Sequence, residues 1–358
     1  MTEGSMRKSV SITAALLLLA AANIRAESRG LTLAVTMTND PASNAVKVYD
    51  ATSKTLLQTL SAGGKGGVAG NARGVKQSNG KVVAVVNNGS NNVAVFERAG
   101  NKLVFQRLVS TSSAPVSIDF GNNHMYVACA STVDSFLMFG NEVAFRDGST
   151  GLILAGGGVP LSGSTAQVGV VDENSLLVSL KTDPTPGTVD VLALHQGAIV
   201  SALPTAVSAP TGSLTPFGFS VYPDGTAIFT LAHSSQDGLF RNKAFTAVIS
   251  AGQTADCWST RVGKYVFTAN TGSKTISRLV GTGNNIFVDG LVAANITTGL
   301  APADIDGAGG ILGVISGASH LSLYGYDEFG ELTASGSPID LGVSTANGVA
   351  IMPSPQND

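Results

Sequence analysis

The sequence predicts an all-β chain folded as a seven-bladed β-propeller. Apolar residues alternate at period two from Leu31 to the end, punctuated by Gly, Asn, Asp and Ser, and no long helical stripe interrupts them. A unit of hydrophobic strand, short polar turn and second alternating strand also recurs seven times, at spacings of roughly 38 to 51 residues. That period fits one four-stranded propeller blade, so seven blades are expected.

The clearest copy of the unit lies at residues 254–280, where an extended segment precedes a hydrophobic strand, a polar turn and a further strand. The hydrophobic strand is expected at residues 33–36, 82–86, 125–128, 176–180, 227–231, 265–268 and 311–315. The second strand is expected at residues 45–49, 92–96, 135–139, 189–194, 245–249, 275–279 and 321–326. A blade therefore builds outward from the extended segment, which should line the central channel.

The extended segments also predict how the ring closes. Six of them precede a hydrophobic strand, at residues 71–75, 114–118, 165–169, 215–219, 254–258 and 301–305. The seventh, at residues 345–349, is followed by no further blade, whereas the N-terminal unit begins directly with its hydrophobic strand. We therefore expect the C-terminal strand to complete the first blade, which removes an open sheet edge.

The N-terminus has the three-part layout of a secretory signal. A basic pair, Arg7 and Lys8, precedes a run of small and aliphatic residues at 12–22, and a polar exit follows through Arg25. We predict a signal peptide at residues 1–26, a single propeller domain at residues 27–358, and a secreted or lumenal location. The apolar run is too short for a permanent anchor, so no stable membrane anchor is expected, with a signal anchor as the alternative.

Composition and motif searches exclude several function classes. The net charge is −3 and no basic stripe is present, which argues against binding of nucleic acid. The four histidines lack the spacing of metal ligands, so we predict neither a metal nor another cofactor. The glycine-rich stretches at 63–67 and 156–158 lack the strand and helix context of a phosphate-binding loop, and no G-x-S-x-G motif occurs.

Two cysteines and two glycosylation sequons bear on the secreted state. Cys129 and Cys257 fall on the third and sixth units, nearly opposite in the ring, so a disulfide between them requires loops that cross the channel mouth. The sequons at Asn88 and Asn295 predict N-glycosylation in a eukaryotic secretory route.

One mouth of the channel is the predicted site. The start of each inner segment and the turn after each hydrophobic strand should meet there, which gathers apolar walls and a few polar groups as in small-molecule sites. The candidate catalytic residues are Gln167, Trp258, Lys181 and His233. The candidate substrate-binding residues are Arg73, Asn87, Val116, Phe217, Cys257, Asn270 and Asn347. Alternatively, these side chains only fill a narrow channel and build its turns.

Five motifs resemble those of the lactonase-type seven-bladed propellers, the phosphogluconolactonase-like and carboxymuconate-cyclase-like group. They start at Thr38, Val86, Thr215, Thr254 and Thr268, and read TNDP, VNNGSNN, TPFGF, TADCW and TANTGS. The resemblance covers residues 31–353 and implies a lactone-hydrolysing or lactonising enzyme, with His233 or an acidic residue governing its pH dependence. The sequence departs from the His, Glu and Arg set of a sugar-phosphate lactonase.

The signal, the sequons and the two cysteines are similar to those of secreted fungal propellers from secondary-metabolite pathways, some of which are hetero-Diels–Alderases. This resemblance implies an apolar pocket that couples a tropolone or phenolic quinone methide to a sesquiterpene alkene such as a humulene alcohol. Phe217 and Trp258 would then be stacking walls, with Gln167, Asn347, Arg73 or Lys181 as hydrogen-bond donors. Small apolar metabolites are the expected partners. The alternatives are the lactone-acting enzyme and a non-enzymatic secreted binding protein.

Overall fold

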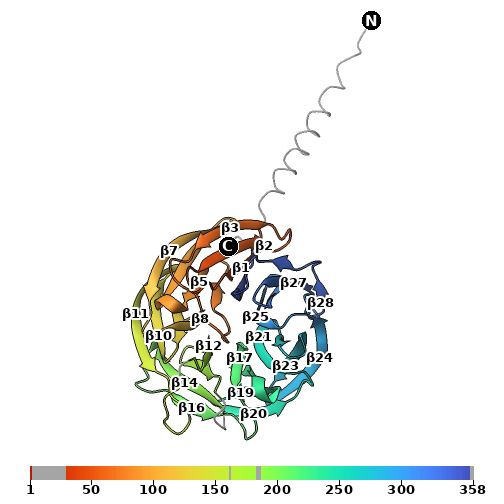
Figure 1. Cartoon of the computed structure of the whole chain (residues 1–358). Helices are drawn as coiled ribbons and strands as arrows, with labels where there is room; N and C mark the ends of the chain where they lie inside the picture. Colours follow the sequence, from red (N-terminus) through yellow and green to blue (C-terminus); the bar gives the residue numbers. More distant parts are fainter. Residues whose placement is uncertain (2–29, 161–162, 183–186, 355–358) are drawn as a thin grey trace.

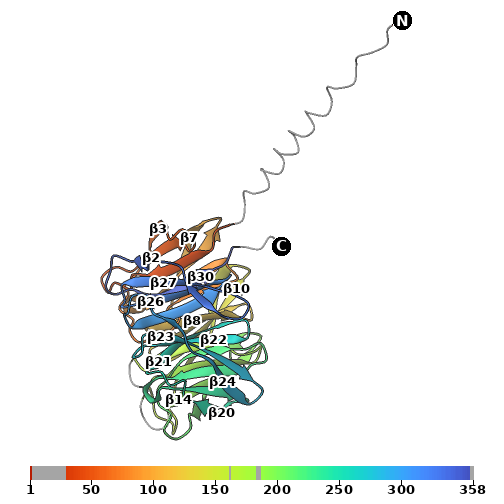
Figure 2. The ribbon, with the colours of Figure 1, turned by 90° about the vertical axis from the view of Figure 1, so that its right-hand side faces the viewer.

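The computed structural model describes residues 1, 30–160, 163–182 and 187–354. Seven antiparallel sheets surround a central axis, as Figure 1 shows. Figure 2 shows the same ring turned by 90°. The predicted seven-bladed β-propeller is therefore confirmed. Residues 2–26 of the predicted signal peptide lie outside the described residues. No described helix is both long and apolar enough to span a bilayer.

Each blade is one sheet, with its strands ordered from the channel outward. Blade 1 consists of β30 (Asn347–Met352), β1 (Leu33–Met37), β2 (Ala45–Asp50) and β3 (Leu56–Ser61). Blade 2 consists of β4 (Val75–Ser78), β5 (Val82–Asn87), β6 (Asn92–Ala99) and β7 (Lys102–Ser110). Blade 3 consists of β8 (Pro115–Gly121), β9 (His124–Cys129), β10 (Thr132–Phe139) and β11 (Glu142–Gly151). Blade 4 consists of β12 (Thr165–Val170), β13 (Ser175–Leu180) and β14 (Thr188–His195), with β15 (Ala198–Ile199) and β16 (Thr205–Ser208) both outermost. Blade 5 consists of β17 (Pro216–Val221), β18 (Ala227–Leu231), β19 (Gln236–Arg241) and β20 (Ala244–Ile249).

Blades 6 and 7 complete the ring. Blade 6 consists of β21 (Asp256–Val262), β22 (Tyr265–Asn270), β23 (Thr275–Thr282) and β24 (Asn285–Asn295). Blade 7 consists of β25 (Pro302–Ala308), β26 (Ile311–Ser316) and β27 (His320–Tyr326), with β28 (Leu332–Ala334) and β29 (Ile339–Asp340) both outermost. Two short 3₁₀ turns, η1 (Asn88–Ser90) and η2 (Ala232–Ser234), follow the second strands of blades 2 and 5.

The second strand of each blade is hydrophobic on both faces because a neighbouring blade covers each face. β5 reads VVAVVN and β22 reads YVFTAN, and every residue of both is buried. Outer strands such as β3 and β24 expose many of their residues. Side chains of blades 5 and 6 form one apolar cluster between them, in which Ile228, Leu239 and Val266 each have 0% exposure. Most of the hydrophobic core therefore lies between blades.

The ring closes as the sequence predicts. β30 at the C-terminus pairs antiparallel with β1 at the N-terminus, so that Leu33 lies opposite Met352 and Met37 opposite Asn347. The first blade thus combines strands from both ends of the chain.

One predicted strand was wrong. The return strand of blade 5 was expected at residues 245–249, but that stretch lies in the outer strand β20, and the return strand is β19. β19 reads QDGLFR, and its Gln, Asp and Gly obscure the alternating pattern. All three are nevertheless buried or half-buried, because β19 lies inside the sheet between β18 and β20.

The inner strands all run in the same direction, which defines two channel mouths. We call the mouth at which the inner strands begin the proximal mouth, and the mouth at which they end the distal mouth. The end of each second strand lies at the proximal mouth, as shown by Asp256 of β21 opposite Asn270 of β22. The predicted meeting of strand starts and turns at one mouth is confirmed.

Candidate functional site

The proximal mouth is closed by the chain itself. The linker between β3 and β4, residues 62–74, crosses it, and Asn71 is fully buried there. The backbone oxygen of Asn71 accepts a hydrogen bond from Trp258 Nε1 at 2.8 Å. The side-chain Nδ2 of Asn71 donates to the backbone oxygen of Val116 at 2.7 Å. Its Oδ1 accepts from Asn347 Nδ2 at 2.9 Å. Asn71 therefore connects blades 6, 3 and 1 across the axis.

The predicted apolar walls belong to this closure. Phe217 and Trp258 pack edge to face, with ring centroids 5.4 Å apart and an interplanar angle of 79°. Their exposed fractions are only 6% and 8%, and that of Val116 is 4%. The resemblance implied that Phe217 and Trp258 are stacking walls of an apolar pocket, but in this structure the two rings are buried and pack against each other, so the space between them is filled.

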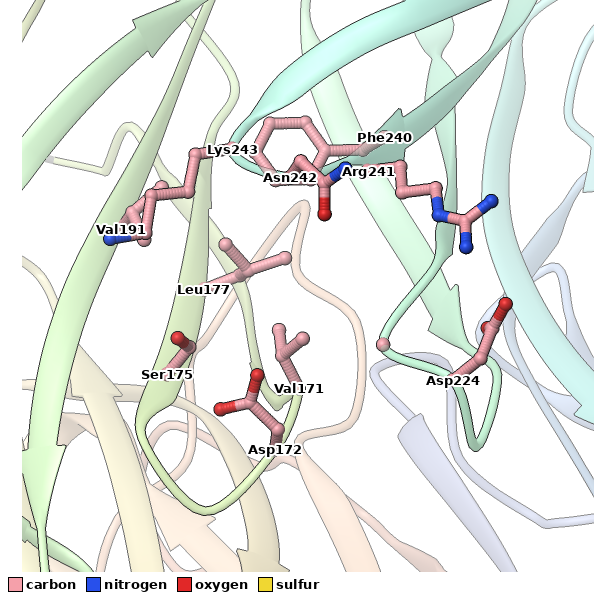
Figure 3. Close-up of a pocket in the computed structure, with 11 residues that line it drawn as sticks. Val171, Asp172, Ser175, Leu177, Val191, Asp224, Phe240, Arg241, Asn242 and Lys243 are labelled. Carbon is pink, nitrogen blue, oxygen red and sulfur yellow. The ribbon is translucent and has the colours of Figure 1, made fainter. Parts of the chain in front are cut away.

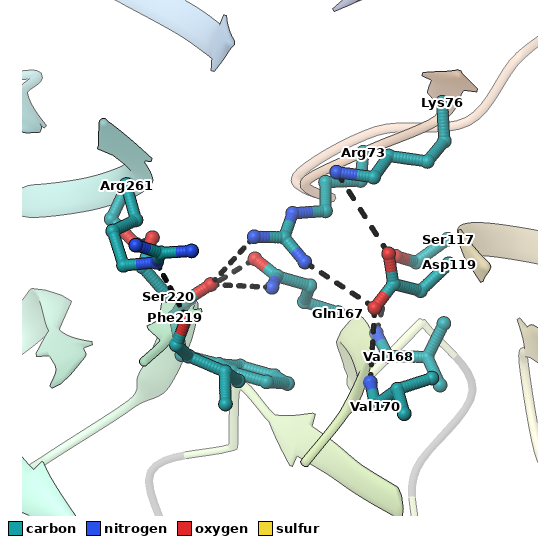
Figure 4. Close-up of polar contacts among 12 residues, drawn as sticks. Arg73, Lys76, Ser117, Asp119, Gln167, Val168, Val170, Phe219, Ser220 and Arg261 are labelled. Atoms are coloured by element: carbon teal, nitrogen blue, oxygen red, sulfur yellow. Dashed lines mark hydrogen bonds and ion pairs between the residues drawn. The ribbon is translucent and has the colours of Figure 1, made fainter. Parts of the chain in front are cut away.

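Gln167 is a structural cap in this structure. Inner strands hydrogen-bond to a partner on one side only, so their other N–H and C=O groups need side-chain partners. Gln167 is fully buried, donates from Nε2 to the Phe219 oxygen at 2.7 Å and accepts from the Phe219 N–H at 3.0 Å. Figure 4 shows this pairing. Because Gln167 is fully buried and its amide pairs with the backbone of Phe219, it does not present the expected donor to a substrate.

Several other inner-strand side chains cap the next blade in the same way. Ser117 and Asp119 accept the N–H groups of Val168 and Val170 at 3.2 and 2.9 Å. Two further carboxylates, those of Asp304 and Asp306, accept N–H groups of β30 at 3.2 and 2.8 Å. Much of the polarity of the channel wall is therefore explained by the unpaired strand edges.

Lys181 holds the linker in place. Its Nζ donates to the Ala69 oxygen at 3.0 Å and to the Gly70 oxygen, and it lies 6.0 Å from the centroid of the Phe217 ring. Burial lowers the pKa of Lys181 to about 8. Lys181 also lines a cavity of about 250 Å³ between blades 2, 3 and 4, together with Val116 and Asn88.

The remaining candidates at the proximal mouth do not converge. Asn87 is buried, and its amide donates to the Ala62 oxygen and to Asn92 and accepts from Asn44. The amide of Asn270 donates to the hydroxyls of Thr275 and Ser277. His233 is exposed in η2. These residues sit in separate blades, and the two asparagines brace their own turns.

Cys129 and Cys257 are free thiols, so the possible disulfide between them does not form in this structure. Burial, and next the carboxylate of Asp134, raise the pKa of Cys129 to about 12, while burial raises that of Cys257 to about 11. We expect Ellman's reagent to label neither thiol within minutes in the native protein and both after denaturation without reductant, because little thiolate exists at neutral pH. Fewer than two thiols in the denatured, unreduced protein would contradict this.

The sequons differ in their surroundings. Asn295 is exposed at the end of outer strand β24. Asn88 is half-buried, and its Nδ2 donates to the Pro115 oxygen at 3.0 Å. N-glycosylation at both positions stays a prediction.

The distal mouth holds an open, charged cavity on the axis. Its volume is about 230 Å³, and its lining comes from six blades: Arg73, Lys76, Gln77, Asp119, Val170, Val221, Thr260, Arg261, Asp306 and Gly307. Of these residues, only Arg73 is among the candidates predicted from the sequence, and it was expected at the other mouth.

The cations of this cavity are anchored by the channel wall. Arg73 donates to the Phe219 oxygen at 3.1 Å and lies 3.8 Å from the Asp119 carboxylate, which is also 3.8 Å from Lys76 Nζ (Figure 4). Arg261 donates from Nε to the Val221 oxygen at 2.8 Å. These contacts fix three cationic groups around one opening.

The charges of the cavity do not balance. When ionised, Arg73, Lys76 and Arg261 supply three positive charges, and Asp119 and Asp306 supply two negative ones, which leaves a net charge of +1. Asp306 uses Oδ2 to accept the Ile351 N–H, and within the described part of the chain Oδ1 has no hydrogen bond. The cavity therefore offers a basic oxygen and a surplus of cationic donors to a small ligand.

The repeat alignment contained a signal for this site. Five residues after the first residue of each aligned inner segment, it places charged side chains at a single ring position: Lys76, Asp119 and Asp306. The candidate residues predicted from the sequence lie near the starts of the inner strands, whereas this cavity lies near their ends.

A second cavity on the distal face lies away from the axis, between blades 4 and 5. It measures about 190 Å³ and is lined by turn residues that include Asp172, Asp224, Arg241 and Lys243 (Figure 3).

Across the described ranges, no group of three or more His, Cys, Asp or Glu side chains could hold a metal ion. The axial distal cavity is thus the best candidate site, since six blades converge on it.

Solved structures show the same fold. The periplasmic gluconolactonase of Pseudomonas aeruginosa has a TM-score of 0.65 at 13% identity, over 91% of this chain and 99% of that one. A candidate 6-phosphogluconolactonase from Bacteroides uniformis has a TM-score of 0.64 at 15% identity, over 90% and 100%. A virginiamycin B lyase from Staphylococcus aureus has a TM-score of 0.56 at 14% identity, over 82% and 94%.

No protein-family model and no curated protein sequence matches the chain. At such identities the similarity shows the fold, and the fold is similar to that of lactonases and of a lyase alike. The reaction must therefore be argued from the side chains of the site.

Proposed function

We propose that this protein binds a small, oxygen-rich lactone at the distal mouth and hydrolyses it, or forms it in the reverse direction. The observation that carries the proposal is the axial cavity, which is lined both by three cationic side chains and by the Asp306 carboxylate, whose Oδ1 has no hydrogen bond among the described residues. The lactonases among the structures with this fold support the choice of substrate class.

The residues present can divide the work of lactone opening. Asp306 takes a proton from a water molecule as the water oxygen attacks the lactone carbonyl carbon. The carbonyl oxygen gains negative charge, which Lys76 and Arg261 stabilise from the cavity wall. When the intermediate collapses, the ring C–O bond breaks, the ring oxygen leaves as an alkoxide, and the protonated Asp306 returns the proton to it. The product is the open hydroxy acid.

The surplus positive charge favours an anionic substrate. A phosphate or carboxylate group on the lactone would neutralise it, and arginine and lysine both bind such groups by charge-assisted hydrogen bonds. The sequence alone showed only Arg73 and Lys181 as cations of the predicted site, whereas the distal cavity gathers Arg73, Lys76 and Arg261.

The cycloaddition hypothesis receives no support from the proximal mouth. It requires an apolar pocket between Phe217 and Trp258, and those rings pack against each other beneath the linker. It stays a prediction that no comparison tests.

Hydrolysis of glucono-δ-lactone and 6-phosphoglucono-δ-lactone, followed by acid release at constant pH, tests the proposal. We expect turnover above the spontaneous rate for the purified protein. If both lactones open only at the spontaneous rate while their acids still bind, the non-enzymatic binding protein is correct. If neither lactone nor acid is affected or bound, the proposed site is wrong.

Replacing Lys76 with Met should raise KM for the phosphorylated lactone roughly 10-fold to 100-fold, because a charge-assisted hydrogen bond contributes about 1.5–3 kcal/mol. Among the described residues Lys76 forms one ion pair, to Asp119 at 3.8 Å, and this pair is long, so the fold should persist. Lys243→Met removes an exposed lysine from the peripheral cavity and is the matched control. Equal KM values for both variants would contradict a role for Lys76 in binding.

A further inference from the structure

Two aspartates are buried together between blades 5 and 6, away from the distal cavity. Asp237 lies on β19 and Asp256 begins β21, and both are fully buried. Within the described ranges, no other residue donates a hydrogen bond to any of the four carboxylate oxygens, and each carboxyl group is the other's only hydrogen-bond partner. Burial and the neighbouring carboxylate of Asp256 raise the pKa of Asp237, and burial raises that of Asp256 to about 6. The two carboxyl groups therefore have no partner except each other.

Other buried aspartates of this chain have donors. Asp134 accepts from the Ser112 N–H and the Ser149 hydroxyl at 2.8 and 2.6 Å, and Asp304 accepts two backbone N–H groups. No described Lys, Arg or His side chain forms an ion pair with Asp237 or Asp256. Because an unpaired buried charge costs several kcal/mol, this pair needs a cation or a proton that the polypeptide does not supply.

Asn270 provides an independent indication of a ligand. It is fully buried and lies directly opposite Asp256 in the β21–β22 ladder, so both side chains are on the same face of blade 6. Its Nδ2 donates to Thr275 and Ser277 on β23, at 2.9 and 2.8 Å. The amide oxygen must then point away from β23, toward β21 and Asp256. That oxygen has no partner in the part of the chain that the structure describes.

The face in question packs on blade 5. Val266 of β22 and Leu279 of β23 meet Ile228 and Leu239 of blade 5 in one cluster. Thr268 lies between Val266 and Asn270 at the same period-two positions of β22, is fully buried, and has an unpartnered hydroxyl. The carboxylates, the amide oxygen and this hydroxyl thus share one interface between two blades.

We propose that Asp237, Asp256 and Asn270 bind a hard divalent cation such as Ca²⁺ between blades 5 and 6, with the Thr268 hydroxyl as a further oxygen ligand. Carboxylate, amide and hydroxyl oxygens are the ligands that Ca²⁺ accepts, and its flexible coordination suits a site built from two separate sheets. The cation would neutralise both buried carboxylates and join blade 5 to blade 6. This role is structural and independent of the proposed reaction.

Thermal unfolding with and without calcium tests the site. The full-length protein is stripped with EDTA, dialysed, and unfolded at increasing CaCl₂ concentrations. We expect Tm to rise by about 3–6 °C at calcium concentrations a hundred times Kd, because the cation binds only the folded state. Asp256→Asn should abolish this shift, and Asp304→Asn, which alters a buried aspartate whose oxygens have donors, should retain it.

Terbium luminescence provides a second readout that does not depend on unfolding. The stripped protein should bind Tb³⁺ at one site from which Ca²⁺ displaces it, and Asp237→Asn should lose that binding even if its Tm is altered. If calcium leaves Tm unchanged and the stripped protein instead becomes more stable as the pH falls from 7 to 5, the carboxylates share a proton and the cation site is refuted. Stability would rise as the pH falls because the raised pKa values make the folded state bind more protons than the unfolded state between pH 7 and pH 5.

Discussion

Replacing Asp306 with Asn is expected to lower kcat for lactone hydrolysis by about 10²–10⁴-fold, the contribution typical of a positioned general base. The substitution removes the basic oxygen but keeps an acceptor for the Ile351 N–H, which Asp306 now binds at 2.8 Å. The contact between blades 7 and 1 should therefore survive. The rate is measured by acid release, and Tm is measured alongside it.

Asp304→Asn is the matched control for this prediction. Asp304 lies two residues earlier on β25, is buried, and accepts the Val349 N–H at 3.2 Å, but it does not line the cavity. It should retain wild-type kcat. An equal loss in both variants would show that the effect comes from the blade contact, and an unchanged rate in Asp306→Asn would show that another group activates water.

Replacing Trp258 with Ala should destabilise the protein by about 3–5 kcal/mol, as is typical when a large buried aromatic side chain is removed. The change opens a cavity beside Phe217 and deprives the buried Asn71 oxygen of its donor at 2.8 Å. Because Trp258 is the only tryptophan, unfolding by urea is followed by circular dichroism rather than fluorescence.

Phe329→Ala is the control, since Phe329 is 63% exposed and its loss should change stability by no more than about 0.5 kcal/mol. The sequence-based hypothesis expected Trp258→Ala to abolish product formation while the fold survived. If Trp258→Ala is as stable as the wild type and only activity is lost, the closed proximal mouth opens in solution and that hypothesis regains its basis.

The fold could be predicted from sequence because its determinants are local and repeated. Buried second strands such as β5 read as continuous apolar runs. The pairing of β30 with β1 was implied by one surplus inner segment at the C-terminus and by the lack of an inner segment in the N-terminal unit. The exception was β19, whose Gln236 and Asp237 imitate turn residues although the strand lies inside its sheet.

The site could not be predicted as well, because it depends on where one linker goes. Residues 62–74 contain six glycines and look like any loop, yet Asn71 within them closes the proximal mouth. Arg73 was placed at the correct end of β4, but its long side chain reaches the Asp119 carboxylate and the distal cavity. Gln167 was correctly placed on an inner strand, and only its partner, Phe219, shows that it caps an edge.

The pairing of β30 with β1 makes the two ends of the polypeptide depend on each other during biosynthesis. β1 emerges from the ribosome first and has no channel-side neighbour until residues 347–352 are made. Until then the nascent ring has an exposed strand edge that other chains can join, which is a known route to aggregation. Proteolytic loss of β30 alone would leave the protein permanently at that unfinished stage.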